Sequence, residues 1–311
     1  MKKHFAFSKI LLLIGVVFFG CSEPAVDSLT NDDTIQAGNT GFSHADMRIE
    51  SEDKLTVPIV RTEEVWDFLR ESFVENPDRL QAIDASLEAT YSEELFVDTY
   101  FDTPDLKLHA MQSGVRHRRR TNVSDPNDNK SGKELMQVKI NNISSNALHR
   151  GEIKFGIDYP HKFKSMDDKH PAIGIVKRSK RDEFKETVAK LGLNAQDLQP
   201  VATNEQRRRR IYITHNNSPF MSISLDEVSS EVLWARIRFT ELEPELNEIA
   251  YTDADEYTRA YMDKIGSKIT EAIRAQFPDI QRDLTPKYNK VVNAFEQKIP
   301  FFRFLVRHQL I

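Results

Sequence analysis

The sequence predicts an α+β fold in which an antiparallel sheet carries flanking helices. Two observations lead to this prediction. Seven or eight segments show the two-residue alternation of half-buried strands, and about four others show the spacing of amphipathic helices. The strands also follow one another without the regular strand–helix–strand order that builds a parallel sheet. A doubly wound fold is therefore excluded.

The first predicted strand spans residues 47–57, because apolar and charged side chains alternate there. Later strands are separated by turn-forming residues, such as the Asn216-Asn217 pair that suits a hairpin. The other predicted strands span residues 96–101, 115–121, 134–140, 148–157, 206–214, 220–225 and 233–242.

The first predicted helix spans residues 63–73. Thr62 is a suitable N-cap for it, and Val65, Leu69 and Phe73 fall on one face. The other predicted helices span residues 106–112, 180–191, 255–277 and 286–297.

Length and composition exclude several classes of protein. With 311 residues and 39% hydrophobic content, the chain can form one large domain or two ordinary ones. Its formal charge of −5 argues against a general nucleic-acid binder, whose surface is usually basic. The single cysteine excludes a disulfide framework and a cysteine-based zinc site. Nucleic acid is therefore not an expected partner.

Residues 1–20 have the pattern of a secretory signal. Lys2, Lys3 and Lys9 stand at the start of the chain, which has no acidic residue there, and an apolar run over residues 10–19 follows. A membrane-spanning helix needs a longer run of ~20 apolar residues. We therefore predict that residues 1–20 direct export and are removed.

Cys21 lies directly after this run, where a bacterial lipoprotein signal places the thiol that receives lipid. Phe18 and Phe19 stand where such signals usually carry smaller residues, so a plain signal peptide with an incidental cysteine is the alternative. We predict lipid anchoring at Cys21 to a bacterial membrane, on the periplasmic side or at the cell surface. The chain then divides into a flexible tether over 21–44, a folded domain over 45–300 and a C-terminal tail over 301–311.

Charged residues occupy alternate positions on several predicted strands. Arg116, Arg118 and Arg120 share one face of a strand, which is unfavourable unless water or anions meet the guanidinium groups. The same pattern recurs at Glu50, Glu52, Lys54, Lys139, Arg150, Glu152, Lys154, Arg207, Arg209, Glu241, Glu243 and Glu245.

Two interpretations of this pattern are open. The charged positions can form the solvated face of an antiparallel sheet. They can instead line an interior that binds a polyphosphate and a divalent cation. Arginine contacts phosphate in a bidentate manner, and Mg²⁺ is commonly held by a few carboxylates together with substrate phosphates.

A series of motifs resembles one known family. Glu50-Ser-Glu-Asp-Lys54 is similar to the Glu-x-Glu-x-Lys signature near the start of the CYTH domain, the fold of the triphosphate tunnel metalloenzymes. Tyr100-Phe-Asp-Thr-Pro-Asp-Leu106 and Gly114-Val-Arg-His-Arg118 resemble the family's next block. Further blocks follow in the family's order, at Gln137-Val-Lys139, Arg150-Gly-Glu152, Arg207-Arg-Arg-Arg-Ile-Tyr212, Leu225-Asp226, Glu241-Leu-Glu243 and Pro286-Lys-Tyr288. The resemblance covers residues 45–295.

The resemblance implies an eight-stranded antiparallel barrel whose charged interior is a tunnel for triphosphate and Mg²⁺ or Mn²⁺. Members of the family hydrolyse inorganic triphosphate, thiamine triphosphate or RNA 5′-triphosphate ends, and some cyclise ATP. Matching positions imply catalytic roles for Glu50, Glu52 and Lys54. The implied phosphate-binding residues are Arg116, Arg118, Lys139, Arg150, Arg207, Arg209 and Lys287. The implied metal ligands are Glu50, Glu52, Asp226, Glu241 and Glu243.

Three residues depart from the family's pattern. Gln137 stands where threonine is frequent, and Lys154 replaces a further glutamate that could bind metal or act as a base. Pro244 is expected to interrupt the last acidic strand, which leaves the role of Glu245 open. We predict metal-dependent hydrolysis of inorganic triphosphate or a short polyphosphate. The alternative is a non-catalytic binder that captures phosphate compounds or a polyanionic partner in the same interior.

Overall fold

The computed structural model describes residues 48–125, 127, 132–141, 148–160 and 162–311, without the side chains of residues 49, 50, 148 and 149. The predicted signal, Cys21 and the tether up to residue 44 lie outside the described residues. None of the described helices is both long and apolar enough to span a membrane.

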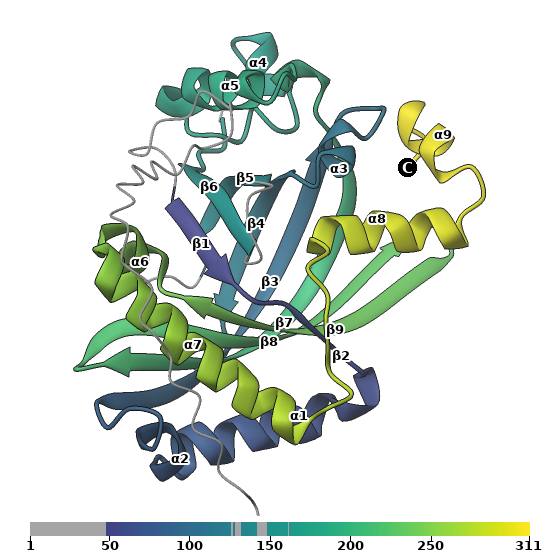
Figure 1. Cartoon of the computed structure of the whole chain (residues 1–311). Coiled ribbons are helices and arrows are strands. Elements are labelled where there is room, and N and C mark those ends of the chain that lie inside the picture. Colours follow the sequence, from purple (N-terminus) through teal and green to yellow (C-terminus); the bar gives the residue numbers. More distant parts are fainter. Residues whose placement is uncertain (1–47, 126, 128–131, 142–147, 161) are drawn as a thin grey trace, which may run out of the picture. The chain divides into compact units, whose positions relative to one another are not determined.

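Ten strands form one antiparallel sheet that curves around a central space (Figure 1). Their order across the sheet is β1-β6-β5-β4-β3-β7-β8-β9-β2-β10. The strands are β1 (Arg48–Glu52), β2 (Leu55–Val57), β3 (Leu87–Asp102), β4 (Gly114–Asn122), β5 (Glu134–Asn141), β6 (Leu148–Gly156), β7 (Gln199–His215), β8 (Ser218–Val232), β9 (Ala235–Leu246) and β10 (Gln281–Arg282). The α+β class and the antiparallel order are therefore confirmed.

The prediction of an eight-stranded closed barrel is wrong. The sheet has ten strands, and it does not close, because β1 and β9 meet at only one residue pair, Glu52 with Glu245. One added strand arises because the predicted strand over 47–57 is broken at Asp53. There the Asp53 N–H donates to the Pro244 carbonyl at 2.8 Å, and β1 pairs with β6 while β2 pairs with β9. The other is the short β10, which pairs with β2.

The expected interruption at Pro244 does not occur, because β9 continues through it and Pro244 lies opposite Ile223 of β8. The nitrogen and the carbonyl of a strand residue face the same neighbouring strand. The Pro244 carbonyl faces Asp53, so its nitrogen, which has no hydrogen, faces the break between β1 and β2. Proline is tolerated here because few ladder hydrogen bonds are available at that break.

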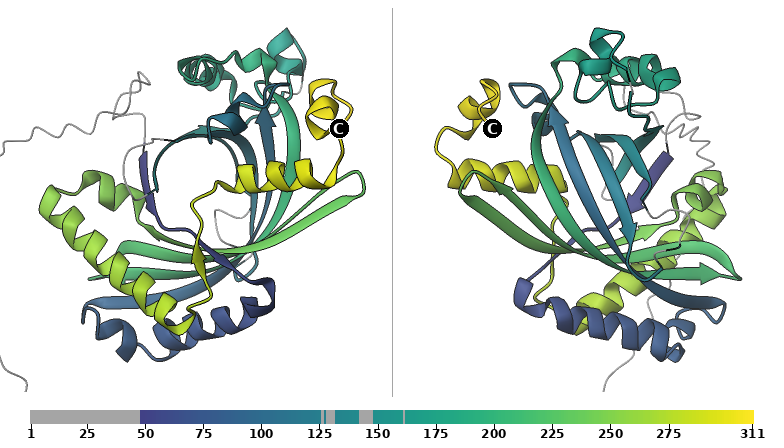
Figure 2. Two further views of the ribbon diagram at one scale, coloured as in Figure 1. Left: turned by 45° about the vertical axis from the view of Figure 1, so that its right-hand side comes forward. Right: turned by 180° about the vertical axis from the view of Figure 1, so that it is seen from behind.

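Helices cover most of the outside of the sheet, and one of them, which starts at Lys287, begins at the inner face (Figure 2). They are α1 (Thr62–Arg70), α2 (Asp78–Gln81), α3 (Lys107–Ala110), α4 (Met166–Lys169), α5 (Arg181–Lys190), α6 (Glu248–Asp253), α7 (Glu256–Gln276), α8 (Lys287–Lys298) and α9 (Phe302–Arg307). Short 3-10 turns span Ile59–Arg61, Arg178–Lys180 and Ala195–Asp197, and a π-helical turn over Glu71–Glu75 follows α1.

Two apolar clusters hold these helices to the sheet. One joins α1 and α7 to the outer face of β7 and β8, and includes Leu69, Ile211 and Ile269. The other joins α5, α8 and α9 to β3, β4, β5 and β6 and to one end of β7 and β9, and includes Phe184 and Phe295. The first of these clusters lies on the outer face, whereas the second reaches the inner face at one end, where Tyr100 and Tyr288 border the central space. The rest of the inner face carries mainly polar and charged side chains.

Two local expectations are corrected at helix ends. Thr62 is not an N-cap but the first residue of α1, and its hydroxyl donates to the Ile59 carbonyl at 2.8 Å. The tail after residue 300 contains α9, which the sequence did not predict. Phe302 and Val306 of α9 are buried in the core beside α8.

Asp255 caps the long helix α7 as an aspartate should, accepting from the Thr258 N–H at 2.7 Å.

Candidate functional site

A cavity of about 620 Å³ lies along the inner face of the sheet. Its walls are strongly charged, and many of the charges come from neighbouring strands at alternate positions. The basic side chains are Lys54, Arg116, Arg118, Arg120, Lys133, Lys139, Arg150, Lys154, Arg208, Arg210 and Lys287. The acidic side chains are Glu52, Glu94, Glu152, Glu243, Glu245 and Glu248.

The structure brings most of the predicted site residues to this one cavity. Glu52, Lys54, Arg116, Arg118, Lys139, Arg150, Glu243 and Lys287 line it. Asp226 and Glu241 lie directly behind, in ion pairs with Lys287. The backbone of Glu50 pairs with that of Arg150, but the side chain of Glu50 is not among those described.

Two predicted phosphate ligands, Arg207 and Arg209, face the other way. Arg207 donates to Glu93 at 2.8 Å, and Arg209 donates to Glu63 of α1 at 2.7 Å, both on the outer face. The neighbouring residues Arg208 and Arg210 line the cavity instead. The prediction for Arg207 and Arg209 is therefore wrong by one residue.

The cause of this error is the run of four arginines, which contains no apolar residue to show which face is buried against helices. The signal lay just beyond it. Ile211 and Ile213 are buried in the cluster under α1 and α7, and residues of odd number on this stretch of β7 share their face.

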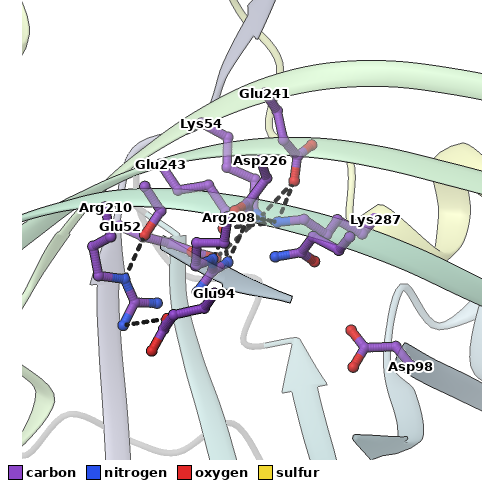
Figure 3. A network of polar contacts seen from close by, with 12 residues as sticks. Glu52, Lys54, Glu94, Asp98, Arg208, Arg210, Asp226, Glu241, Glu243 and Lys287 are labelled. Atoms are coloured by element: carbon purple, nitrogen blue, oxygen red, sulfur yellow. Dashed lines mark hydrogen bonds and ion pairs between the residues drawn. The ribbon is translucent and has the colours of Figure 1, made fainter. Parts of the chain in front are cut away.

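Three buried carboxylates meet at the centre of the site. Asp226 of β8 and Glu241 and Glu243 of β9 have ligand atoms within 4.8 Å of one another (Figure 3). The Nζ of Lys287 lies among them, at 2.8 Å from Asp226, 2.5 Å from Glu241 and 2.7 Å from Glu243. Arg208 adds a two-pronged contact with Asp226, at 2.6 and 2.5 Å. We call Asp226, Glu241 and Glu243 the carboxylate trio.

The cationic groups around the trio keep Asp226 and Glu243 ionised. Burial acts to raise the pKa of Glu243, but Lys287, Lys54 and Arg208 outweigh it and hold that pKa well below its usual range. Burial likewise acts to lower the pKa of Lys287, yet the carboxylates around it raise the pKa above its ordinary value. Asp226, Glu243 and the Lys287 ammonium are therefore charged at neutral pH.

The trio has the donor chemistry of a site for a hard divalent cation. Mg²⁺ and Mn²⁺ prefer carboxylate oxygens, and the trio supplies three such groups from two adjacent strands. Glu52 lies at the edge of the cluster, where its Oε1 is buried without a hydrogen-bond partner among the described residues. Lys54 connects Glu52 to the trio, with its Nζ in an ion pair with Glu243 and 3.6 Å from Glu52. The residues present fit such a cation, which would compete with Lys287 for the same oxygens.

The basic wall is organised by an aspartate that the sequence analysis missed. Asp98 of β3 accepts from Arg118 at 2.6 Å through both of its oxygens and from Arg116 at 3.2 Å. Burial opposes ionisation of Asp98, but the Arg118 and Arg116 guanidinium groups outweigh it and lower its pKa to about 2. The sequence signal was its even-numbered position on the strand, which it shares with Phe96 and Tyr100. The register that places Asp98 opposite Arg118 comes from the structure.

Arg150 differs from its neighbours because its guanidinium forms no ion pair with any side chain that the structure describes. It is 4% exposed, and its Nε and Nη2 have no hydrogen-bond partner in the described part of the chain. Lys139, on the adjacent strand, lies 3.7 Å from Glu152. A buried guanidinium without an anion is unfavourable, so Arg150 is a ready contact for an anion in the cavity.

Several solved structures are distantly similar to this chain. The PH1819 protein of Pyrococcus horikoshii is 16% identical, with 78% of this chain and 98% of that chain covered and a TM-score of 0.43. HpAC1 of Hippeastrum, named for adenylyl cyclase and described as having a dominant triphosphatase activity, is 16% identical, with coverage of 77% and 93% and a TM-score of 0.41. The S. pombe RNA triphosphatase Pct1 is 12% identical, with coverage of 83% and 82% and a TM-score of 0.31.

A search of curated proteins finds no match to this chain. The comparison with family models does find one. The CYTH domain model matches residues 72–267, which is more than half of the chain and includes β3 to β9. This match agrees with the charged inner face and with the order of the sequence motifs. The chain belongs to the CYTH domain family.

Proposed function

We propose that this protein hydrolyses inorganic triphosphate or a short polyphosphate in the cavity, with the help of a divalent cation. The observation that carries the proposal is the division of one cavity into a basic wall and a buried carboxylate trio. A polyphosphate needs many cationic donors, and phosphoryl transfer needs charge neutralisation at the reacting group. The cavity supplies both on one inner face.

In this proposal the basic wall binds and orients the substrate. Arg150 and Lys139 hold phosphate oxygens, and Arg116 and Arg118 do so from positions fixed by Asp98. The planar guanidinium groups favour bidentate contacts, which hold the phosphate chain in one orientation. Arg210 extends this wall along β7.

The carboxylate trio, together with Glu52, would hold the Mg²⁺ or Mn²⁺ ion. When bound, this cation supplies charge neutralisation at the transferring phosphoryl group and polarises the attacking water. Lys287 and Lys54 keep Glu243 ionised and in place. Arg208 fixes Asp226 from the opposite side, so the trio is pre-organised before substrate binds.

A non-catalytic binder is the second candidate, and Lys154 favours it. The Lys154 Nζ lies 2.6 Å from Glu152 and 2.9 Å from Glu248, so a cation occupies the position where the family often has another carboxylate. Glu152 is held by Lys154 and Lys139 together. A cavity that binds phosphate compounds without turnover needs only the basic wall. A lysine in place of a carboxylate at position 154 would therefore not weaken its binding.

Phosphate release separates the two candidates. The full chain is given inorganic triphosphate, ATP or thiamine triphosphate with Mg²⁺, Mn²⁺ or EDTA. We expect release that needs the cation, is highest for inorganic triphosphate and falls at least 100-fold in Glu52→Gln. Glu227→Gln is the matched control, because Glu227 contacts Arg207 and Arg209 on the outer face. An absence of release, with a rise in melting temperature on adding triphosphate, would make the protein a binder.

We also propose that the chain is exported and lipid-anchored at Cys21. Support comes from the basic start, the apolar run over residues 10–19 and the position of the only cysteine. Cells that express the chain are grown with a labelled fatty acid. The protein should take up the label, and Cys21→Ser should not. An unlabelled wild-type protein would leave a plain signal peptide as the explanation.

A further inference from the structure

Two β-hairpins with two-residue turns occur among the described residues, and their turn residues differ sharply. Between β7 and β8, Asn216 and Asn217 both have positive φ, at +50° and +62°, and asparagine tolerates this conformation well. Between β8 and β9 the turn is Leu233-Trp234, and Leu233 has a φ of +54°. A first turn position of this kind favours glycine. Leucine is there despite the backbone strain.

Neither side chain of this second turn contributes much to the core. Leu233 is 50% exposed and Trp234 is 71% exposed. Folding therefore explains neither residue, since a polar pair with glycine would make a better turn and would avoid apolar exposure. Strained, exposed apolar residues point to a function at the surface.

An exposed apolar residue with a positive φ also occurs beside this turn, just after the end of α8. Phe301 has a φ of +59° and is 82% exposed, and Phe304 of α9 is also exposed. The two regions touch, because the Lys298 Nζ donates to the Arg236 carbonyl at 2.7 Å. Figure 2 shows the β8–β9 hairpin projecting beside the end of α8. We call Leu233, Trp234, Phe301 and Phe304 the apolar tip.

Basic residues lie close in sequence to the members of the apolar tip. Arg236 and Arg238 on β9 and Lys298, Arg303 and Arg307 at the end of the chain are all exposed. Arg303 forms an ion pair with Glu296, and Glu231 is the exposed acid next to the turn. The concentration of positive charge is local, because the whole chain has a formal charge of −5.

We propose that the apolar tip inserts into the interface of an anionic lipid bilayer while the neighbouring basic residues contact the headgroups. Tryptophan and leucine between basic residues suit the boundary between headgroups and acyl chains. Arginine and lysine near an anionic surface add attraction. A second copy of the chain is a poorer occupant, since a two-fold contact would bring the two sets of basic residues together. The proposal does not depend on the activity of the cavity.

Tryptophan fluorescence tests this directly, because the chain has two tryptophans and only Trp234 is well exposed. Trp66→Phe leaves Trp234 as the single reporter in the full chain. Vesicles of phosphatidylglycerol should shift its emission to the blue, and brominated acyl chains should quench it. Binding to vesicles of phosphatidylcholine alone, followed by the same signal, should be at least 10-fold weaker. The apolar run over residues 10–19 can also bind vesicles, but it contains no tryptophan and does not move this signal.

Two variants and one control complete the test. Arg236→Glu combined with Arg238→Glu should weaken phosphatidylglycerol binding at least 10-fold. Leu233→Gly should raise the melting temperature, because the turn relaxes, and yet weaken vesicle binding. Tyr257→Ala removes another exposed aromatic residue, on α7, and should change neither the melting temperature nor vesicle binding. Binding without a shift or quenching of Trp234 would overturn the proposal. A blue shift that depends on protein concentration and not on lipid would overturn it in favour of a second copy.

Discussion

The arginines on the two faces of β7 lie in different environments, although they are neighbours in the sequence. Arg207 and Arg209 lie outside, where they contact Glu93 and Glu63 at the surface. Arg208 lies inside and is buried against Asp226 and Glu243. Outside, solvent screens the half-exposed Arg207, while Arg209 is buried beneath α1 and is paired with Glu63 and Glu227. Inside, every charge must be paired or must meet an anion, so the inner face is where binding energy is available.

The largest difference between the faces is expected in stability. Arg208→Met removes the main partner of the buried Asp226 and should lower the free energy of unfolding by about 3–5 kcal/mol. Arg207→Met breaks only surface ion pairs and should cost about 0–1 kcal/mol. Urea unfolding of the two variants measures both values. Equal losses would mean that the two faces do not differ as described.

Acid unfolding sharpens the comparison through Asp98. Its pKa in the folded protein is about 2, below the value of about 3.9 expected for an unfolded chain. Because the folded pKa is depressed, the stabilisation is fully present above about pH 4 and is lost as the pH falls toward 2. The loss should be about 2 kcal/mol.

The matched variant for this titration is Asp98→Asn. It should be less stable at neutral pH, because Arg116 and Arg118 lose their anion. Its free energy of unfolding should change less than that of the wild type between pH 4 and pH 2. A variant with the wild-type slope over this range would show that Asp98 is not the group that titrates.

Arg150 should separate stability from binding. Arg150→Met removes a buried guanidinium whose Nε and Nη2 have no hydrogen-bond partner in the described part of the molecule, so stability should be unchanged or slightly higher. The affinity for inorganic triphosphate should fall about 10-fold, as expected for one charged contact. Calorimetric titration and thermal melting measure the two quantities on the same sample. A loss of stability without a loss of affinity would assign Arg150 a structural role only.

The smallest effect is expected on the outer face of β7. Glu63→Gln weakens the contact with Arg209, and the loss of stability should be less than about 1 kcal/mol, because Glu63 is largely exposed and Arg209 keeps its ion pair with Glu227. Triphosphate affinity should not change. A clear change in affinity would mean that the outer face communicates with the cavity, which no contact described above provides.

The sequence predicted the fold class and many of the residues at the cavity because the motifs lie on strands with clear alternation. Arg116 and Arg118 were placed correctly at the cavity, where Val115, on the other face, is buried in the core. The arginine run of β7 lacked that guide within itself. The broken first strand could not be predicted either, because the break depends on a contact between Asp53 and Pro244, far apart in the sequence.

Pairing inside the cavity was also beyond a sequence argument. Asp98 is one of several acids on β3, and only the register with β4 places it opposite Arg118. In the same way, Lys287 begins a helix on the other side of the trio, and its position at the centre follows from packing of α8. Local patterns identify charged strands, while long-range packing decides which charges meet.

Calorimetric titration of the full chain with inorganic triphosphate, in EDTA, tests most directly whether the inner face binds phosphate. The comparison is between Arg210→Gln, which alters the inner face of β7, and Arg207→Gln, which alters its outer face. We predict that Arg210→Gln weakens binding about 10-fold and that Arg207→Gln changes it less than about 2-fold. Equal effects, or a larger effect of Arg207→Gln, would contradict the assignment of the cavity as the triphosphate site.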